Sequence, residues 1–174
     1  MRKALFCAAH VLLLTSFAQA QSPTNIIEEF GLLGAWAVDC EQSPSPTNEH
    51  SMFSITSVGT VQLRNDFGIS YDEMVYRIIA ANRQGPDKLS LRQVLTTDAA
   101  IVLDVVLVKA DEKIRVWSSR GSNGTPLVRD GAIPRSNGQE TRWNLHCQGR
   151  WTDDPAHSPQ RTSVPAEPAQ QVGH

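Results

Sequence analysis

Two short segments near the ends of the β-rich part of the chain resemble one another. Residues 34–40 read GAWAVDC and residues 141–147 read TRWNLHC, so in each a tryptophan precedes a cysteine by four positions. Both segments are rich in residues that favour extended structure. A disulfide between Cys40 and Cys147 requires their backbones to approach within several ångströms. It therefore restricts the chain to folds in which these two segments are neighbours.

The first twenty residues have the pattern of a secretory signal. Arg2-Lys3 precedes an apolar run over residues 5–14, and Ala18-Gln19-Ala20 is a cleavage site of the A-x-A type. The apolar run is shorter than the roughly 20 residues that a membrane-spanning helix needs. We therefore expect residues 1–20 to be a signal peptide and the mature protein to be periplasmic or secreted.

Export determines what is expected of the cysteines and the charge. Cys7 lies within the signal, so Cys40 and Cys147 remain as an even pair in an oxidising compartment, where a disulfide is the expected state. The mature chain keeps 14 basic residues against 18 acidic ones, a net charge of −4. This balance offers no basic surface for nucleic acid. No further apolar stretch reaches the length of a transmembrane anchor.

One helix and eight strands are expected after the signal. Ser22 and Pro23 form an N-cap signal, and apolar residues recur at helical spacing behind them, which predicts an amphipathic helix over residues 23–33. From Gly34 onward the apolar period is two, with glycine- and proline-containing turns at hairpin-length intervals. The strands predicted on this pattern cover residues 34–40, 50–58, 60–65, 71–81, 88–97, 101–109, 113–119 and 140–148, with a turn-rich excursion over 121–138.

The absence of crossover helices between these strands excludes parallel connections and indicates an antiparallel meander. We expect an all-β fold, an eight-stranded up-and-down barrel in which the first strand pairs with the last. A β-sandwich is the alternative. If Cys40 and Cys147 are directly opposed in the ladder, the same register places Trp36 opposite Trp151.

Gly34-Ala35-Trp36 follows a short helix and opens the first strand, and it is similar to the G-x-W signature of lipocalins and the wider calycin barrels. The resemblance covers residues 23–151. It implies an eight-stranded barrel with the tryptophan at its closed end, beneath an arginine from the last part of the chain. Arg142 and Arg150 are the arginines available there. The T-D-Y motif and long C-terminal helix of full lipocalins are absent. The chain also resembles small exported bacterial proteins of unknown role.

Residues 21–152 are expected to form this single barrel domain. The composition changes after Trp151, because residues 153–174 contain four prolines and few large apolar residues. Such a segment cannot bury enough surface to offset the entropy of ordering it. We therefore expect a disordered, proline-rich tail.

No catalytic or cofactor motif is found, and we expect neither enzymatic activity nor a cofactor or metal. His50 and His146 belong to strands with the first strand between them, and no third ligand is evident. Asp72 and Glu73 are adjacent in a strand and would point to opposite faces. Asp104 interrupts an apolar run, and we expect it on the solvated face; burial would require a partner or raise its pKa.

Two functions remain open. The first is an exported, non-enzymatic binding protein whose barrel accepts a small apolar ligand. The second is a protein-interaction or protease-inhibitor-type envelope protein with a filled core, whose partner is an envelope or extracellular protein. An interior of roughly 300 Å³ would favour the ligand, and a filled interior the interaction. The residues expected to contact a ligand are Trp36, Phe53, Ile55, Met74, Tyr76 and Leu91.

Overall fold

The structure is a computed structural model that describes residues 21–148. The expected signal peptide and proline-rich tail, with Arg150 and Trp151, lie outside the described residues. One helix, α1 (Pro23–Phe30), precedes the strands, as the sequence predicted.

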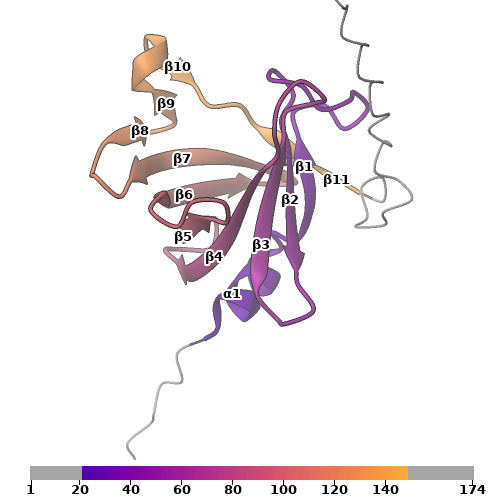
Figure 1. Cartoon of the computed structure of the whole chain (residues 1–174), viewed down its shortest axis with the longest axis vertical. Helices are drawn as coiled ribbons and strands as arrows, with labels where there is room; N and C mark the ends of the chain where they lie inside the picture. Colours follow the sequence, from indigo (N-terminus) through magenta and orange to yellow (C-terminus); the bar gives the residue numbers. More distant parts are fainter. Residues whose placement is uncertain (1–20, 149–174) are drawn as a thin grey trace, which may run out of the picture.

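Eight antiparallel strands close into a barrel, which confirms the predicted fold and excludes the sandwich (Figure 1). Each strand pairs with the next along the chain from the first to the seventh, and the last strand pairs with both the first and the seventh. The strands are β1 (Gly34–Ala37), β2 (His50–Ile55), β3 (Val61–Asp66), β4 (Met74–Arg83), β5 (Lys88–Leu95), β6 (Val102–Ala110), β7 (Lys113–Gly121) and β11 (Asn144–Cys147).

The excursion between β7 and β11 forms a lobe outside the barrel. β8 (Pro126–Val128) pairs with the end of β7, and β9 (Ala132–Ile133) pairs with β10 (Gln139–Glu140) around the short 3-10 helix η1 (Pro134–Ser136). Figure 1 shows this lobe projecting from the β7 side, away from β2 and β3. Arg115 of β7 packs against the segment that returns from this lobe to β11. Its guanidinium lies 5.5 Å from the centroid of the Trp117 ring and 4.7 Å from that of the Trp143 ring.

α1 fills one end of the barrel. The Ser22 hydroxyl accepts a hydrogen bond from the Asn25 N–H at 3.2 Å, so the predicted N-cap is confirmed. The helix ends at Phe30 and not at residue 33. The N–H groups of Gly31 and Leu32 turn back to the carbonyls of Glu28 and Ile27, which closes the last turn.

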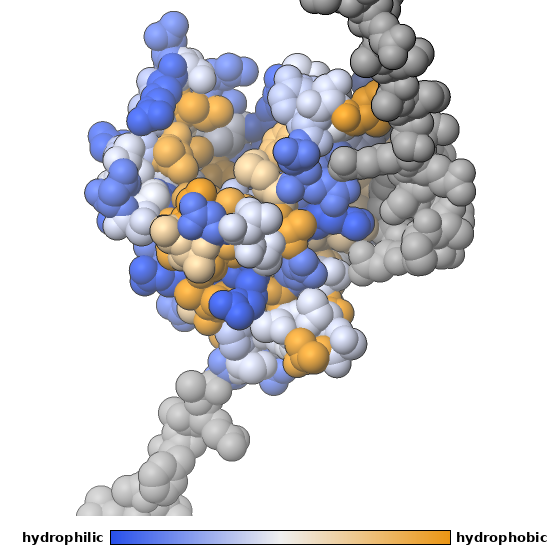
Figure 2. All heavy atoms as spheres, in the orientation of Figure 1, coloured by the Kyte–Doolittle hydropathy of each residue, from blue (hydrophilic) through white to orange (hydrophobic). Residues whose placement is uncertain are grey.

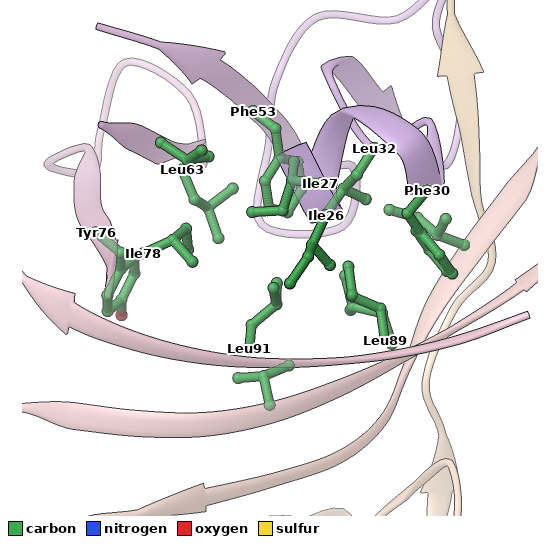
Figure 3. Close-up of a cluster of buried hydrophobic side chains, with 14 of the residues drawn as sticks. Ile26, Ile27, Phe30, Leu32, Phe53, Leu63, Tyr76, Ile78, Leu89 and Leu91 are labelled. Atoms are coloured by element: carbon green, nitrogen blue, oxygen red, sulfur yellow. The ribbon is translucent and has the colours of Figure 1, made fainter. Parts of the chain in front are cut away.

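The apolar face of α1 points into the barrel. Figure 3 shows Ile26, Ile27 and Phe30 directed from the helix toward Leu89 and Leu91 of β5. All five side chains are buried. Burial of each large apolar side chain stabilises the fold by roughly 1.5–3 kcal/mol. The helix is therefore part of the core.

Two basic residues fix the C-terminal end of α1 against the strands. The Lys109 ammonium donates a hydrogen bond to the Phe30 carbonyl at 3.2 Å, and it lies 5.8 Å from the centroid of the Phe30 ring. The Arg83 guanidinium lies 5.7 Å from the same centroid. A cation at this position complements the negative end of the helix dipole. Residues from the β4–β5 and β6–β7 hairpins thus hold the helix in the barrel.

The Cys40–Cys147 disulfide is present, with 5.4 Å between the Cα atoms, but the predicted register was wrong. Cys147 is opposite Ala35, and Trp36 is opposite His146. The ladder of β1 ends at Ala37, before Cys40.

The side chain of Asn48 explains why β1 ends early. Its amide oxygen accepts from the Asp39 N–H at 2.9 Å, and its amide nitrogen donates to the Asp39 carbonyl at 2.9 Å. The backbone groups of Asp39 are therefore bonded to a side chain, and the chain leaves the sheet. Cys40 reaches its partner from a turn.

Trp36 is the anchor of the seam between β1 and β11. Its side chain is buried, and its indole N–H donates to the Leu32 carbonyl at 2.8 Å. The His146 ring stacks on it with 4.5 Å between centroids, in the place where the calycin resemblance implies an arginine. A Cβ added at Gly34 would lie 2.6 Å from His146 Nε2, so the close approach of this ring requires glycine.

Removing the disulfide should cost a large part of the net stability, which is about 5–15 kcal/mol for a typical domain. A Cys40→Ser, Cys147→Ser double variant loses a crosslink between residues 107 positions apart. The chain-entropy estimate for a loop of that size is about 4.8 kcal/mol. Urea unfolding followed by tryptophan fluorescence should show a lower midpoint, and reductant should shift the parent protein to the same midpoint. Equal midpoints with and without reductant would show that the bond contributes nothing.

Replacing His146 should weaken the same seam. His146→Ala removes the stack on Trp36 and the contact of Nε2 with the Leu33 carbonyl at 3.1 Å, and we expect a loss of about 1–2 kcal/mol in the free energy of unfolding. Leu145→Ala is the matched control, since Leu145 is on the same strand and 38% exposed. Equal losses in the two variants would contradict a specific role for the stack.

Candidate functional site

The interior of the barrel near α1 is filled with side chains. The six residues expected to contact a ligand differ in burial and fall into three groups. Trp36, Phe53, Tyr76 and Leu91 belong to the buried core, and Met74 packs against it from a half-buried position. Ile55 is 36% exposed at the end of β2 and is not part of this cluster. The core consists of Ile26, Ile27, Phe30, Leu32, Trp36, Phe53, Val61, Leu63, Tyr76, Ile78, Leu89, Leu91, Val105, Leu107 and Ile114.

The inner wall becomes polar toward the end opposite α1. Ser51 and Asn65 are paired across β2 and β3, and the Ser51 hydroxyl lies 3.1 Å from Asn65 Oδ1 and 3.3 Å from Glu49 Oε1. Burial raises the pKa of the Glu49 carboxyl, and the Ser51 hydrogen bond offsets part of that rise. Burial also raises the pKa of Tyr76, with a further contribution from the charge of Glu49. A desolvated carboxylate therefore lies near the Tyr76 ring.

A groove of about 710 Å³ crosses β4, β5, β6, β7 and the β8 segment. Strand pairing identifies the face on which it lies. Ser90, Val106 and Ser118 are directly opposed across β5, β6 and β7. They alternate with Leu91 and Val105, which are buried in the core. The side chains of the groove walls therefore stand on the outer face of the barrel.

A second row of opposed residues carries the charge of the groove. Arg92, Asp104 and Arg120 face one another across β5, β6 and β7, and Arg92 Nε lies 3.7 Å from Asp104 Oδ1. The Asp104 side chain is 51% exposed, so its predicted position on the solvated face is confirmed. Arg129 and Asp130 add to the lining from the turn after β8. Three arginines and two aspartates thus border a surface of small residues.

Sequence reasoning missed this groove because β-bulges shape it. The register shifts between Ile78 and Ala80 on β4, and between Val106 and Leu107 where β6 meets β7. Bulges bend a strand and increase its twist. The one available signal was the apolar pair Leu127-Val128 within the turn-rich excursion, and this pair lies in β8.

The two histidines do not form a metal site. His50 is buried beside the 38–49 loop, with Nε2 3.1 Å from the Gln42 carbonyl, and burial lowers its pKa. His146 stacks on Trp36 at the other side of β1. Within residues 21–148, no group of three or more His, Cys, Asp or Glu side chains is arranged to hold a metal ion. Asp72 and Glu73 lie exposed in the turn before β4.

No protein-family model, curated protein or solved structure matches this chain. The likeness to calycins therefore consists of the closed eight-stranded barrel, the preceding helix and the position of Trp36. Across residues 21–148, no helix is both long and apolar enough to cross a membrane.

The pH dependence of stability should report the burial of Glu49. Because its folded pKa lies above the ordinary value of 4.5, the folded state binds this proton more tightly than the unfolded chain. That contribution to stability is complete below pH 4.5 and is lost as the pH rises through the folded pKa. Glu49→Gln should therefore raise the free energy of unfolding at pH 7, with the gain shrinking toward pH 4.5. Urea titrations across this range test it.

Glu28→Gln is the matched control, because Glu28 is an exposed carboxylate on α1. For Glu28→Gln, the difference in the free energy of unfolding from the parent protein should not show a gain at pH 7 that shrinks toward pH 4.5. A Glu49→Gln variant that is less stable than the parent at pH 7 would show that the ionised carboxylate stabilises the fold.

Proposed function

We propose that this chain is an exported, non-enzymatic binding protein that recognises another polypeptide in the groove across β4–β8. The contrast between the interior and the outer face carries this proposal. The interior near α1 is occupied by that helix and the core side chains, whereas the groove of about 710 Å³ is open on the outer face. Its volume is within the range of ligand sites in proteins.

The lining of the groove suits a polypeptide better than an apolar molecule. Ser118 lines the groove with a hydroxyl group, and Arg92, Arg120 and Arg129 supply guanidinium groups. The Ser90 hydroxyl also lines the groove and donates to the Asn82 carbonyl at 3.2 Å. Arginine is enriched at protein interfaces because its planar fork makes several hydrogen bonds while its stem packs on apolar surface. Carbonyl groups and carboxylates of an extended segment would complement these donors.

Export is part of the same proposal. It is supported by the form of residues 1–20 and by the Cys40–Cys147 disulfide, because such bonds persist in oxidising compartments. The proposed location is the periplasm or the medium.

A second candidate function is the binding of a small apolar ligand within the barrel. Met74, Leu95 and Leu103 support it, since they pack against the core from half-buried positions on β4, β5 and β6. A ligand there would lie beyond the filled part of the interior. Lipid released in stoichiometric amount on denaturing natively purified protein would favour this candidate over the groove.

Site-specific photo-crosslinking in the native host tests the groove. A photoreactive residue at Ser118 should give a discrete adduct with a second polypeptide, and Arg120→Ser should reduce its yield several-fold because a charged hydrogen bond is lost. The matched control places the probe at Gln62, a half-buried position on β3 outside the groove. Adducts of equal yield at both positions, or none at Ser118, would contradict the proposal.

A further inference from the structure

Three large apolar side chains are exposed on two loops at the end of the barrel opposite α1. Ile69 is 91% exposed and Tyr71 52% exposed on the β3–β4 loop, and Ile101 is 41% exposed on the β5–β6 loop. The Thr96 N–H donates to the Val75 carbonyl of β4 at 2.8 Å, so the two loops leave the sheet from adjacent strands. Single exposed apolar residues are common, but a group of this kind often marks an interaction surface.

Local hydrogen bonds fix the shape of both loops. The Asp66 carboxylate accepts from the Gly68 N–H at 2.8 Å, and the Gly68 carbonyl accepts from the Tyr71 N–H at 3.0 Å. In the other loop, the Asp98 carboxylate accepts from the Ala100 N–H at 2.9 Å, and the Asp98 backbone carbonyl accepts from the Ile101 N–H at 3.0 Å. The apolar side chains therefore project from ordered turns, so binding would cost little ordering entropy.

Gly68 also ties the β3–β4 loop to the 38–49 loop. Its φ is 93°, and a Cβ added there would lie 2.5 Å from the Pro44 carbonyl oxygen. Only glycine permits this approach. The β3–β4 loop and the 38–49 loop are thus in contact.

The same surface carries negative charge. Asp72, Glu73 and Asp98 are exposed on these loops, and residues 65–76 and 93–104 contain no lysine or arginine. Arg142 reaches the adjacent 38–49 loop, where its guanidinium donates to the Thr47 carbonyl. We call the surface formed by Ile69, Tyr71, Asp72, Glu73, Asp98 and Ile101 the acidic lip.

We propose that the acidic lip docks a cationic, amphipathic segment of another polypeptide. The apolar side chains would be buried by the apolar residues of that segment, and its lysines or arginines would meet the three carboxylates. Charge complementarity of this kind accelerates association and selects the partner. The acidic lip is distinct from the β4–β8 groove, so this proposal stands independently of the proposed function.

Charge also argues against two other occupants. An anionic lipid surface would be repelled by Asp72, Glu73 and Asp98. A second copy joined through the same surface by a two-fold axis would place carboxylates against carboxylates.

Binding of a model peptide tests the proposal. A fluorescent peptide of alternating lysine and leucine is titrated with the full mature protein at low and high salt, alongside its glutamate–leucine counterpart. We expect the lysine peptide to bind and the glutamate peptide not to bind. Asp72→Asn with Glu73→Gln should weaken binding about tenfold at low salt and flatten its salt dependence. Ile69→Ser with Tyr71→Ser should weaken binding about tenfold and keep the salt dependence.

Matched controls lie at the opposite end of the barrel. Val58 is 85% exposed at the tip of the β2–β3 hairpin, and Glu28 and Glu29 form an exposed acidic pair on α1. At the lower end of the barrel, Figure 2 shows only a small hydrophobic spot among more hydrophilic atoms. Val58→Ser, and Glu28→Gln with Glu29→Gln, should leave the affinity within about twofold. Thermal melts of every variant separate lost binding from lost folding.

Four results would overturn the proposal. They are equal losses in lip and control variants, equal binding of the glutamate peptide, binding of anionic vesicles that depends on Ile69, and self-association in sedimentation equilibrium that Asp72→Asn abolishes. Adducts at Ser118 in the groove are unaffected by any of these results, so the two proposals fail separately.

Discussion

The structure depends on the last strand pairing with two partners. β11 is only four residues long, yet it pairs with β1 on one side and with the start of β7 on the other. So short a strand gains little from its ladder alone. The disulfide at Cys147 and the stack of His146 on Trp36 act on the same four residues. Closure of the sheet therefore depends as much on side chains as on backbone hydrogen bonds.

Closure at this seam and the placement of α1 support one another. The Trp36 indole bonds to the Leu32 carbonyl, just after the helix, while its ring bears the His146 imidazole. The tryptophan thus links the segment that follows the helix to the last strand. Lys109 and Arg83 hold the other side of the helix end through Phe30. Because α1 occupies the interior at this end, binding surfaces are more readily supplied by the outer face and the far loops.

The sequence was sufficient for the parts of the fold that follow from local chemistry and periodicity. The Ser22 cap, the alternation in β2–β6 and the pairing of Cys40 with Cys147 all followed from residue type and spacing. The register at the seam did not, because it depends on the Asn48 side chain bonding to the backbone of Asp39. That contact joins two ends of a loop and leaves no periodic signal. The groove likewise depends on bulges, which alternate patterning does not reveal.

The charged residues of the acidic lip and those of the β4–β8 groove occupy different positions in the topology of the barrel. In a closed meander, the β1–β2, β3–β4 and β5–β6 connections meet at one end, and here these loops carry Asp72, Glu73 and Asp98. The arginines of the groove, Arg92 and Arg120, belong instead to strand positions on the outer face. Asp104 and Asp130 also line the groove and offset part of its arginine charge, which weakens its attraction for the acidic lip of a second copy. β8 and the turn after it line part of the groove, so an extended segment lying along the outer face of the barrel would contact both the sheet and this turn.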